Sequence, residues 1–228
     1  MKINFPLLAL AVGAFAIGTT EFSPMGFLPE IANDLSVSIP QAGLLISAYA
    51  VGVMIGAPLM TLWLARFPKK TALILLMAIF TIGNVLATVA PDYMSLMGAR
   101  LITSLNHGAF FGLGSVVAAS VVPKDKQASA VAMMFMGLTI ANIGGVPLAT
   151  WLSQNTSWRM AFAAISILGI MTMLALWKAL PQDHDVVKPN VAKELRVLTR
   201  APVVLALLTT VMSAGAMFAL YTYIAPSL

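Results

Sequence analysis

The stretch Gly137–Trp151, GLTIANIGGVPLATW, decides the fold. Its small residues recur at every fourth position, namely at Gly137, Ala141, Gly145 and Ala149. On a helix this spacing forms one smooth stripe, along which a second helix backbone can approach closely. Because burial drives no association between helices in lipid, close packing of small residues holds membrane helices together. The stretch therefore predicts a packed membrane helix. The stripe either has a functional role or is an ordinary packing seam between helices.

The composition also indicates a membrane protein. Of the 228 residues, 60% are hydrophobic and 9% are charged, and the mean hydropathy is +0.93. A water-soluble domain of this length would have too few polar residues to cover its surface. The chain contains no cysteine, which excludes disulfides, thiol chemistry and cysteine metal sites. The basic residues form no patch with interleaved aromatics, so we expect no nucleic-acid partner.

Seven apolar segments are long enough to cross a hydrocarbon core of about 30 Å at about 1.5 Å per residue. The first follows Lys2 and continues past Glu21 without a small-residue cleavage site, so we interpret it as an uncleaved span and not as a signal peptide. We therefore expect an all-α polytopic membrane protein. The predicted spans cover residues 5–27, 41–64, 71–90, 94–121, 128–152, 158–179 and 203–225.

The basic residues predict the orientation of these spans. Eleven of the thirteen lie at the N-terminus or in connectors on one side, whereas the opposite connectors hold Glu30, Asp34 and Asp92 with only Arg159. By the positive-inside rule the N-terminus is cytoplasmic and the seventh span ends outside, which is the reverse of a seven-helix receptor. The eleven residues are Lys2, Arg66, Lys69, Lys70, Lys124, Lys126, Lys178, Lys188, Lys193, Arg196 and Arg200.

The longest connector, residues 181–200, holds seven charged residues and no apolar run that could span a membrane. The middle of this connector, Lys193–Leu198, is predicted to form a short helix on the membrane surface. We therefore expect the chain to have three parts: a bundle of six spans over residues 1–179, a cytoplasmic linker over 180–202 and a seventh span over 203–228.

Within the six spans, the second and the fifth share a spacing of small residues and proline. Such recurrence is expected when three helices are duplicated in inverted orientation, so it predicts a 3+3 inverted repeat. The matching positions are Ala48, Gly52, Gly56 and Pro58 in the second span and Gly137, Ala141, Gly145 and Pro147 in the fifth.

Glu21, Arg100 and His107 are ionisable residues well inside the predicted spans, where a buried charge is costly and usually has a role. Glu21 near the end of the first span and Arg100 near the start of the fourth both lie roughly 9 Å below the same membrane surface. Arg100 shares one helix face with Thr103, Ser104 and His107. In the functional interpretation Glu21 exchanges a proton under the control of Arg100, and His107 is a further candidate. In the structural one Arg100 bonds carbonyls, Glu21 reaches the headgroups and His107 is a spacer.

Five segments resemble recurring motifs of the major facilitator superfamily, in the drug and sugar proton-antiporter branch that includes the arabinose-efflux-type permeases. The resemblance covers essentially all 228 residues and implies proton-coupled export of a small organic solute, such as a sugar or drug, by alternating access in a bacterial inner membrane. The segments are TTEFSPMGFLP (19–29), RLITSLNHGAFFGLG (100–114), GLTIANIGGVPLATWL (137–152), WRMAF (158–162) and FALYTYIAP (218–226).

The resemblance also suggests roles for particular residues. The stretch around Gly137, Ala141, Asn142, Gly145 and Pro147 corresponds to the antiporter motif, which implies export. Arg100 falls at the fourth-span arginine that the family associates with proton coupling.

The chain departs from the family pattern in the connector after the second span. There the family has an aspartate, an arginine and a glycine before paired basic residues, and the aspartate takes part in a cytoplasmic gate. This chain has Ala65 in place of the aspartate and Pro68 in place of the glycine, so that part of the gate is not carried over. It keeps Arg66, Lys69 and Lys70.

Family members have twelve spans in two six-helix halves, and this chain corresponds to the first half plus the seventh span. The expected partners are a small-molecule substrate, protons, the lipid bilayer, and the second half or a second copy of the chain. A non-transporting fragment that assembles with other membrane proteins is the alternative function. An intramembrane protease is disfavoured because the histidines are only His107 and His184, the latter in the linker. No phosphate-binding glycine loop occurs, and we expect no catalytic residue, metal or cofactor.

Overall fold

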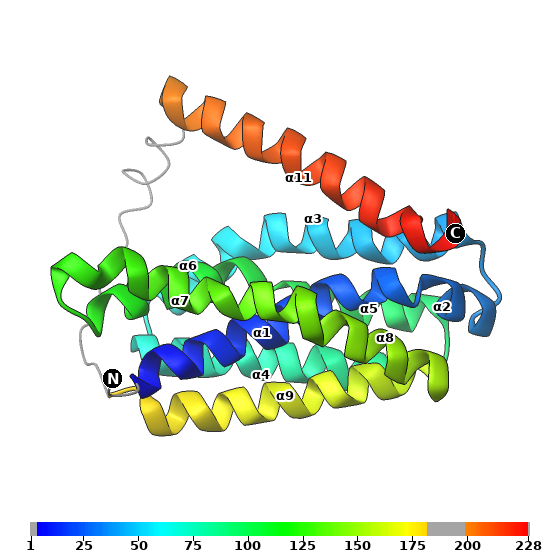
Figure 1. Cartoon of the computed structure of the whole chain (residues 1–228), viewed down its shortest axis with the longest axis horizontal. Helices are drawn as coiled ribbons and strands as arrows, with labels where there is room; N and C mark the ends of the chain where they lie inside the picture. The colour runs from blue at the N-terminus through cyan, green and yellow to red at the C-terminus, as the bar shows by residue number, and fades with distance from the viewer. Residues whose placement is uncertain (1–3, 182–198, 228) are drawn as a thin grey trace.

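The protein is a bundle of long helices, and the computed structural model describes residues 4–181 and 199–227. Seven helical spans in this part are long and apolar enough to cross a membrane, which confirms the all-α polytopic class (Figure 1). The elements are α1 (Phe5–Gly26), α2 (Leu28–Asp34), α3 (Ile39–Leu64), α4 (Lys69–Thr88), α5 (Tyr93–Ser104), α6 (His107–Ser120), η1 (Lys124–Lys126), α7 (Gln127–Ile140), η2 (Ala141–Gly145), α8 (Val146–Asn155), α9 (Trp158–Ala179) and α11 (Ala201–Ser227).

The bundle has two ends. We call the end at which α1 begins the near end and the opposite end, at which α2 lies, the far end (Figure 1). The predicted linker helix over 193–198, as well as Lys2, lies outside the described residues, and the three-part division of the chain stays a prediction.

The fourth span, predicted over residues 94–121, contains a tight turn between α5 and α6. The amides of Leu105 and Asn106 donate to carbonyls three residues back, at Ile102 and Thr103. A turn of this kind is tighter than an α-helix, and in the middle of a helix it often marks a hinge. The predicted span is confirmed, because Tyr93–Ser120 is long and apolar enough to cross a membrane, and the tight turn divides it into two helices.

The fifth span, predicted as one helix over 128–152, contains a wider turn. The five residues Ala141–Gly145 form a π-helix, and the amide of Val146 donates to the carbonyl of Ala141, five residues back. Pro147 follows at once, and because it has no amide donor and its ring crowds the preceding turn, it favours departure from α geometry there. The interruption therefore lies within the small-residue stripe itself.

The stripe of the fifth span packs against α1. All four of its small residues are buried, and the backbones meet so closely that a Cβ atom on Gly137 would lie 2.0 Å from the carbonyl oxygen of Ala11. A Cβ atom on Gly145 would lie 2.3 Å from the hydroxyl of Thr19. The close approach predicted from the spacing is thus confirmed.

The corresponding stripe of the second span packs against the fourth span. A Cβ atom on Gly52 would lie 2.0 Å from the hydroxyl oxygen of Ser104, and one on Gly56 would lie 2.9 Å from the Cα atom of Leu105. The fifth span thus packs on the first as the second packs on the fourth. In two inverted three-helix repeats the first span corresponds to the fourth and the second to the fifth, so the two packing contacts are equivalent, as such repeats require.

The helix α11 is attached to the bundle over part of its length. Figure 1 shows its N-terminal part standing away from the bundle and its C-terminal part approaching α3. The rings of Phe218 in α11 and Phe22 in α1 lie 5.5 Å apart, in a cluster that also includes residues of α2 and α3. Most of α11 is exposed, because only this end packs against the six other spans.

Candidate functional site

A cavity of about 510 Å³ lies between α1, α3 and the C-terminal part of α11. Glu21 is the charged residue among its lining, and the wall otherwise consists of small and apolar residues with the hydroxyls of Ser47, Tyr49 and Thr222. Pockets of this kind, mostly apolar with a few polar groups, are typical sites for small organic ligands. The cavity therefore brings one predicted coupling residue to a place where a solute can bind.

Glu21 faces His107 across the cavity wall. The Oε2 atom of Glu21 lies 3.8 Å from Nε2 of His107, and each side chain is 14% exposed. The other ring nitrogen, Nδ1, lies 3.1 Å from the hydroxyl of Tyr49, so the histidine is held between the two groups. His107 is the first residue of α6, directly after the tight turn in the fourth span. The structure thus places two of the three predicted coupling residues next to each other.

Arg100 lies beneath this pair and is only 1% exposed. Its Nη1 atom donates to the carbonyl of Thr20 at 2.8 Å, and its guanidinium lies 4.2 Å from the centre of the Tyr49 ring. In the functional interpretation of the sequence Arg100 controls Glu21, but among the described residues no ion pair joins these two side chains. Instead, Arg100 bonds the backbone next to Glu21, and its Nε and Nη2 atoms are buried without a hydrogen-bond partner.

Buried polar residues around Arg100 were not predicted as part of the site. The hydroxyl of Thr20 donates to Oδ1 of Asn84 at 2.6 Å, and Nδ2 of Asn84 donates to the carbonyl of Phe80. Asn106, in the tight turn, is fully buried, and neither atom of its amide has a partner. The signal in the sequence was an asparagine inside an apolar span, which is costly to bury and therefore informative.

The antiporter-like stretch fixes the segment of α1 that carries Glu21. Gly145 packs against Thr19, two residues before Glu21, and the side-chain Nδ2 of Asn142 donates to the carbonyl of Leu138 one turn back. Pro147 is exposed and follows the π turn. The stretch itself contributes no group to the lining of the cavity.

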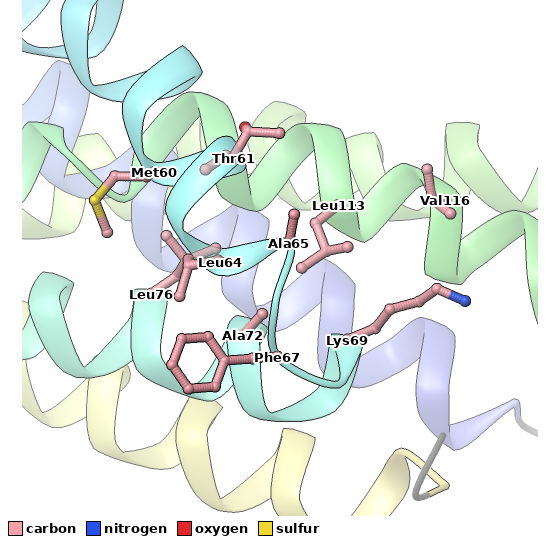
Figure 2. Close-up of a pocket in the computed structure, with 11 residues that line it drawn as sticks. Met60, Thr61, Leu64, Ala65, Phe67, Lys69, Ala72, Leu76, Leu113 and Val116 are labelled. Carbon is pink, nitrogen blue, oxygen red and sulfur yellow. The ribbon is translucent and has the colours of Figure 1, made fainter. Parts of the chain in front are cut away.

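The basic connector predicted as a gate lies at the near end, away from Glu21. Nε of Arg66 donates to the carbonyl of Trp63, and its guanidinium lies 5.5 Å from the centre of that indole ring. Lys70 donates to the carbonyl of Leu180 at the end of α9. Figure 2 shows the cavity beside this connector, about 300 Å³ in volume and lined mainly by apolar side chains of α3, α4 and α6, with Lys69 at one side and Ala65 in its wall.

The fold and the site define a class: a polytopic membrane protein of inverted helical repeats, with an acidic group in the wall of a mainly apolar cavity. Among the described residues, no three of His, Asp and Glu lie together as a metal site would require. Residues 10–228 match the family described as the Major Facilitator Superfamily, and the chain belongs to this family.

Curated relatives agree with this assignment. The chain is 68% identical over 228 residues to the inner membrane transport protein YdhP of Escherichia coli (strain K12), covering all of this chain and 59% of that protein. It is 29% identical to the "Probable sugar efflux transporter" of Mannheimia succiniciproducens, covering 97% of this chain and 56% of that protein. The chain thus spans slightly more than half the length of these relatives.

A solved structure supports the fold. A bacterial homologue of the human lysosomal transporter Spinster, in an inward-facing and unoccupied conformation, superposes with a TM-score of 0.78 at 18% identity. The match covers 97% of this chain and 54% of that one.

Proposed function

We propose that the full-length protein exports a small organic solute, such as a sugar or drug, in exchange for protons by alternating access. Membership of the transporter family and similarity to a protein named for sugar efflux support export. The observation that carries the proposal is the carboxylate of Glu21 in the wall of the cavity between α1, α3 and α11, beside His107. An acidic group at this place can meet both the proton and the solute.

Glu21, His107 and Arg100 divide the work of coupling in this proposal. Glu21 exchanges the proton, because it is the charged residue that borders the cavity. His107 lies beside Glu21 and shares a hydrogen bond with the hydroxyl of Tyr49, which holds its ring in place. Arg100 is sealed beneath, and its unpartnered Nε and Nη2 atoms are able to bind a carboxylate when the first and fourth spans move relative to each other.

The fifth span transmits this movement to α1. Gly137 and Gly145 allow its backbone to lie against α1, and the π turn before Pro147 gives the span a flexible point. A displacement of the fifth span therefore changes the position of Glu21. We propose that rocking of these two helices is part of the transport cycle.

The chain is oriented with its near end toward the cytoplasm in this proposal. Arg66, Lys69 and Lys70 then form a cytoplasmic connector, as the positive-inside rule requires, and the N-terminus is cytoplasmic. The bacterial inner membrane is the compartment that the relative YdhP suggests.

Transport by the full-length protein in proteoliposomes with an imposed pH gradient tests the proposal. A panel of labelled sugars and fluorescent drugs would be screened for flux that the gradient drives. We expect Glu21→Gln and Arg100→Ala to abolish gradient-driven flux, whereas Asp125→Asn, an exposed acidic residue at the near end, leaves it unchanged. Full coupled flux in both site variants would refute the coupling roles, and no gradient-driven flux of any probe in the wild type would refute the function.

Assembly with another membrane protein, without transport, is the second candidate function. It is favoured by α11, most of whose apolar side chains are exposed along the helix. In a bilayer such a face is covered by lipid or by further helices. The size of the protein in native membranes, detected with an antibody against residues 183–193, separates the candidates: a band near 24.1 kDa favours assembly, and a larger one favours the transporter.

A further inference from the structure

A hydrogen-bonded cluster at the far end of the bundle joins α2 to α9 through the carboxylate of Asp34, and joins α9 to the segment after α4 through Arg159. The Oδ2 atom of Asp34, at the end of α2, accepts a hydrogen bond from Nε1 of Trp158 at 3.0 Å and forms an ion pair with Nη1 of Arg159. Nη2 of Arg159 donates to the carbonyl of Ala90, two residues after the end of α4, at 2.9 Å. We call Asp34, Ala90, Trp158 and Arg159 the far-end clamp.

The clamp is continuous with the surroundings of Arg100. The indole of Trp158 packs edge-to-face on the ring of Phe162, one turn further along α9, with ring centres 6.0 Å apart. The Phe162 ring in turn lies 6.0 Å from the guanidinium carbon of Arg100. The guanidinium thus has the Tyr49 ring of α3 as one neighbour and the Phe162 ring of α9 as the other.

These contacts are buried even though the clamp itself reaches the surface. The side chains of Asp34 and Arg159 are partly exposed, whereas Trp158 and Phe162 are buried and belong to one cluster with Ala99, which directly precedes Arg100. An indole N–H at a buried position needs an acceptor, and Asp34 supplies it. The orientation of the indole, and with it the packing on Phe162, therefore depends on a carboxylate at the far end.

We propose that Asp34 is a positioning residue for the coupling arginine: through Trp158 it holds the Phe162 ring against Arg100 and keeps the guanidinium dry and in place. This inference rests on the proposed function for its effect on transport. The geometric part, that the clamp seals the Arg100 region, stands independently of it. The titratable and charged groups near Arg100 on the neighbouring helices are Glu21, Tyr49 and His107, and a shift of the guanidinium changes its interaction with each.

The burial of the Arg100 region can be measured by the reactivity of a single introduced cysteine, because this chain has no cysteine of its own that would react. A single cysteine at Ala99, which is 2% exposed, would be introduced into the full-length protein after replacement of any cysteines outside this chain. In detergent, we expect Asp34→Leu to raise its rate of reaction with a maleimide about tenfold by easing local opening. Asp34→Asn, which keeps an acceptor for the indole, should change the rate little. Trp158→Phe, which keeps a ring but loses the donor, should give an intermediate rate and replaces Asp34→Leu if that variant does not fold. Asp92→Asn, a second far-end carboxylate that does not contact Trp158, is the control.

The effect on coupling is measured by the pH profile of flux in proteoliposomes. We expect Asp34→Leu to shift the midpoint by about half a pH unit or more and to lower kcat, with KM changed by less than about twofold. Phe162→Leu should produce the same shift. Unchanged labelling rates together with an unchanged midpoint of the pH profile would overturn the proposal and would mean that the clamp only stabilises the fold. Absence of gradient-driven flux in the wild type would count against the proposed function, while the labelling rates would still decide whether the clamp seals Arg100.

Discussion

Glu21 faces His107 and not Arg100: its Oε2 atom lies 3.8 Å from Nε2 of the histidine. The two residues belong to the first and the fourth spans, whose relative position changes if the helices rock. Arg100, on the same span as His107, meanwhile bonds the carbonyl of Thr20. A small displacement of α1 along the fourth span would therefore alter both contacts at once, and this is the reason we propose this junction as the place of coupling.

Tyr49 should stabilise the site through both its ring and its hydroxyl. Tyr49→Phe removes the hydrogen bond to His107 and should lower the free energy of unfolding by about 1 kcal/mol. Tyr49→Leu also removes the ring beside Arg100 and should lower it by about 1–2 kcal/mol more. Thermal unfolding in detergent measures both variants, and equal effects would show that the ring contributes nothing.

The glycine stripe should tolerate no side chain where it meets α1. Gly137→Ala places a Cβ atom against the backbone of Ala11 and should lower the free energy of unfolding by about 1–3 kcal/mol. The control is Gly144→Ala, because no heavy atom lies within 4 Å of a Cβ at that position. The control should be neutral or slightly stabilising, and similar unfolding temperatures for the two variants would contradict the packing.

The hydrogen bond between Thr20 and Asn84 should contribute to stability, because its loss leaves a buried polar atom without a partner. Thr20→Val leaves Oδ1 of Asn84 buried without its donor, which should cost about 1–3 kcal/mol of unfolding free energy. Thr20→Ser keeps the hydroxyl and should recover most of this loss. Chemical denaturation in mixed micelles measures the difference, and a valine variant as stable as the wild type would show that the bond is dispensable.

The far-end ion pair should give a pH-dependent contribution to stability. The hydrogen bond from Arg159 holds the pKa of Asp34 below its usual value of 3.8, with the Trp158 hydrogen bond acting in the same direction. A carboxyl with a lowered folded pKa adds stability above its unfolded pKa and loses it as the pH falls through the folded value. The wild type should thus exceed Asp34→Asn in unfolding temperature at pH 7, and this difference should shrink below about pH 4.

Because both side chains are partly exposed, the effect at pH 7 should be at most about 1 kcal/mol. Unfolding temperatures recorded from pH 3 to 7 in detergent provide the measurement. A difference between the two proteins that stays constant over this range would mean that the charge of Asp34 contributes nothing.

The orientation can be checked with single cysteines at the two ends. Lys126→Cys at the near end should react with an impermeant maleimide only in everted vesicles, and Asn33→Cys at the far end only in intact spheroplasts. The reverse pattern would place the N-terminus outside. Neither residue contacts the cavity, so the labels should leave the site intact.

The amino-acid sequence by itself determined the spans, the close packing of the fifth span and the presence of charges inside the membrane. These follow from local properties. Transfer of a segment into lipid depends on its own residues, and a four-residue spacing of small side chains produces a smooth helix face wherever it occurs. Gly137 and Gly145 accordingly meet α1 as predicted.

Only the tertiary structure decided which groups meet. Glu21 pairs with His107 because of the rotation and crossing of the first and fourth spans, and Asp34 bonds Trp158 across 124 residues of sequence. The tight turn at Leu105 and Asn106 was likewise absent from the sequence pattern, since it forms where the backbone of α3 presses against the fourth span. Side-chain pairing depends on the relative placement of whole helices, and that placement is set by packing over the entire bundle.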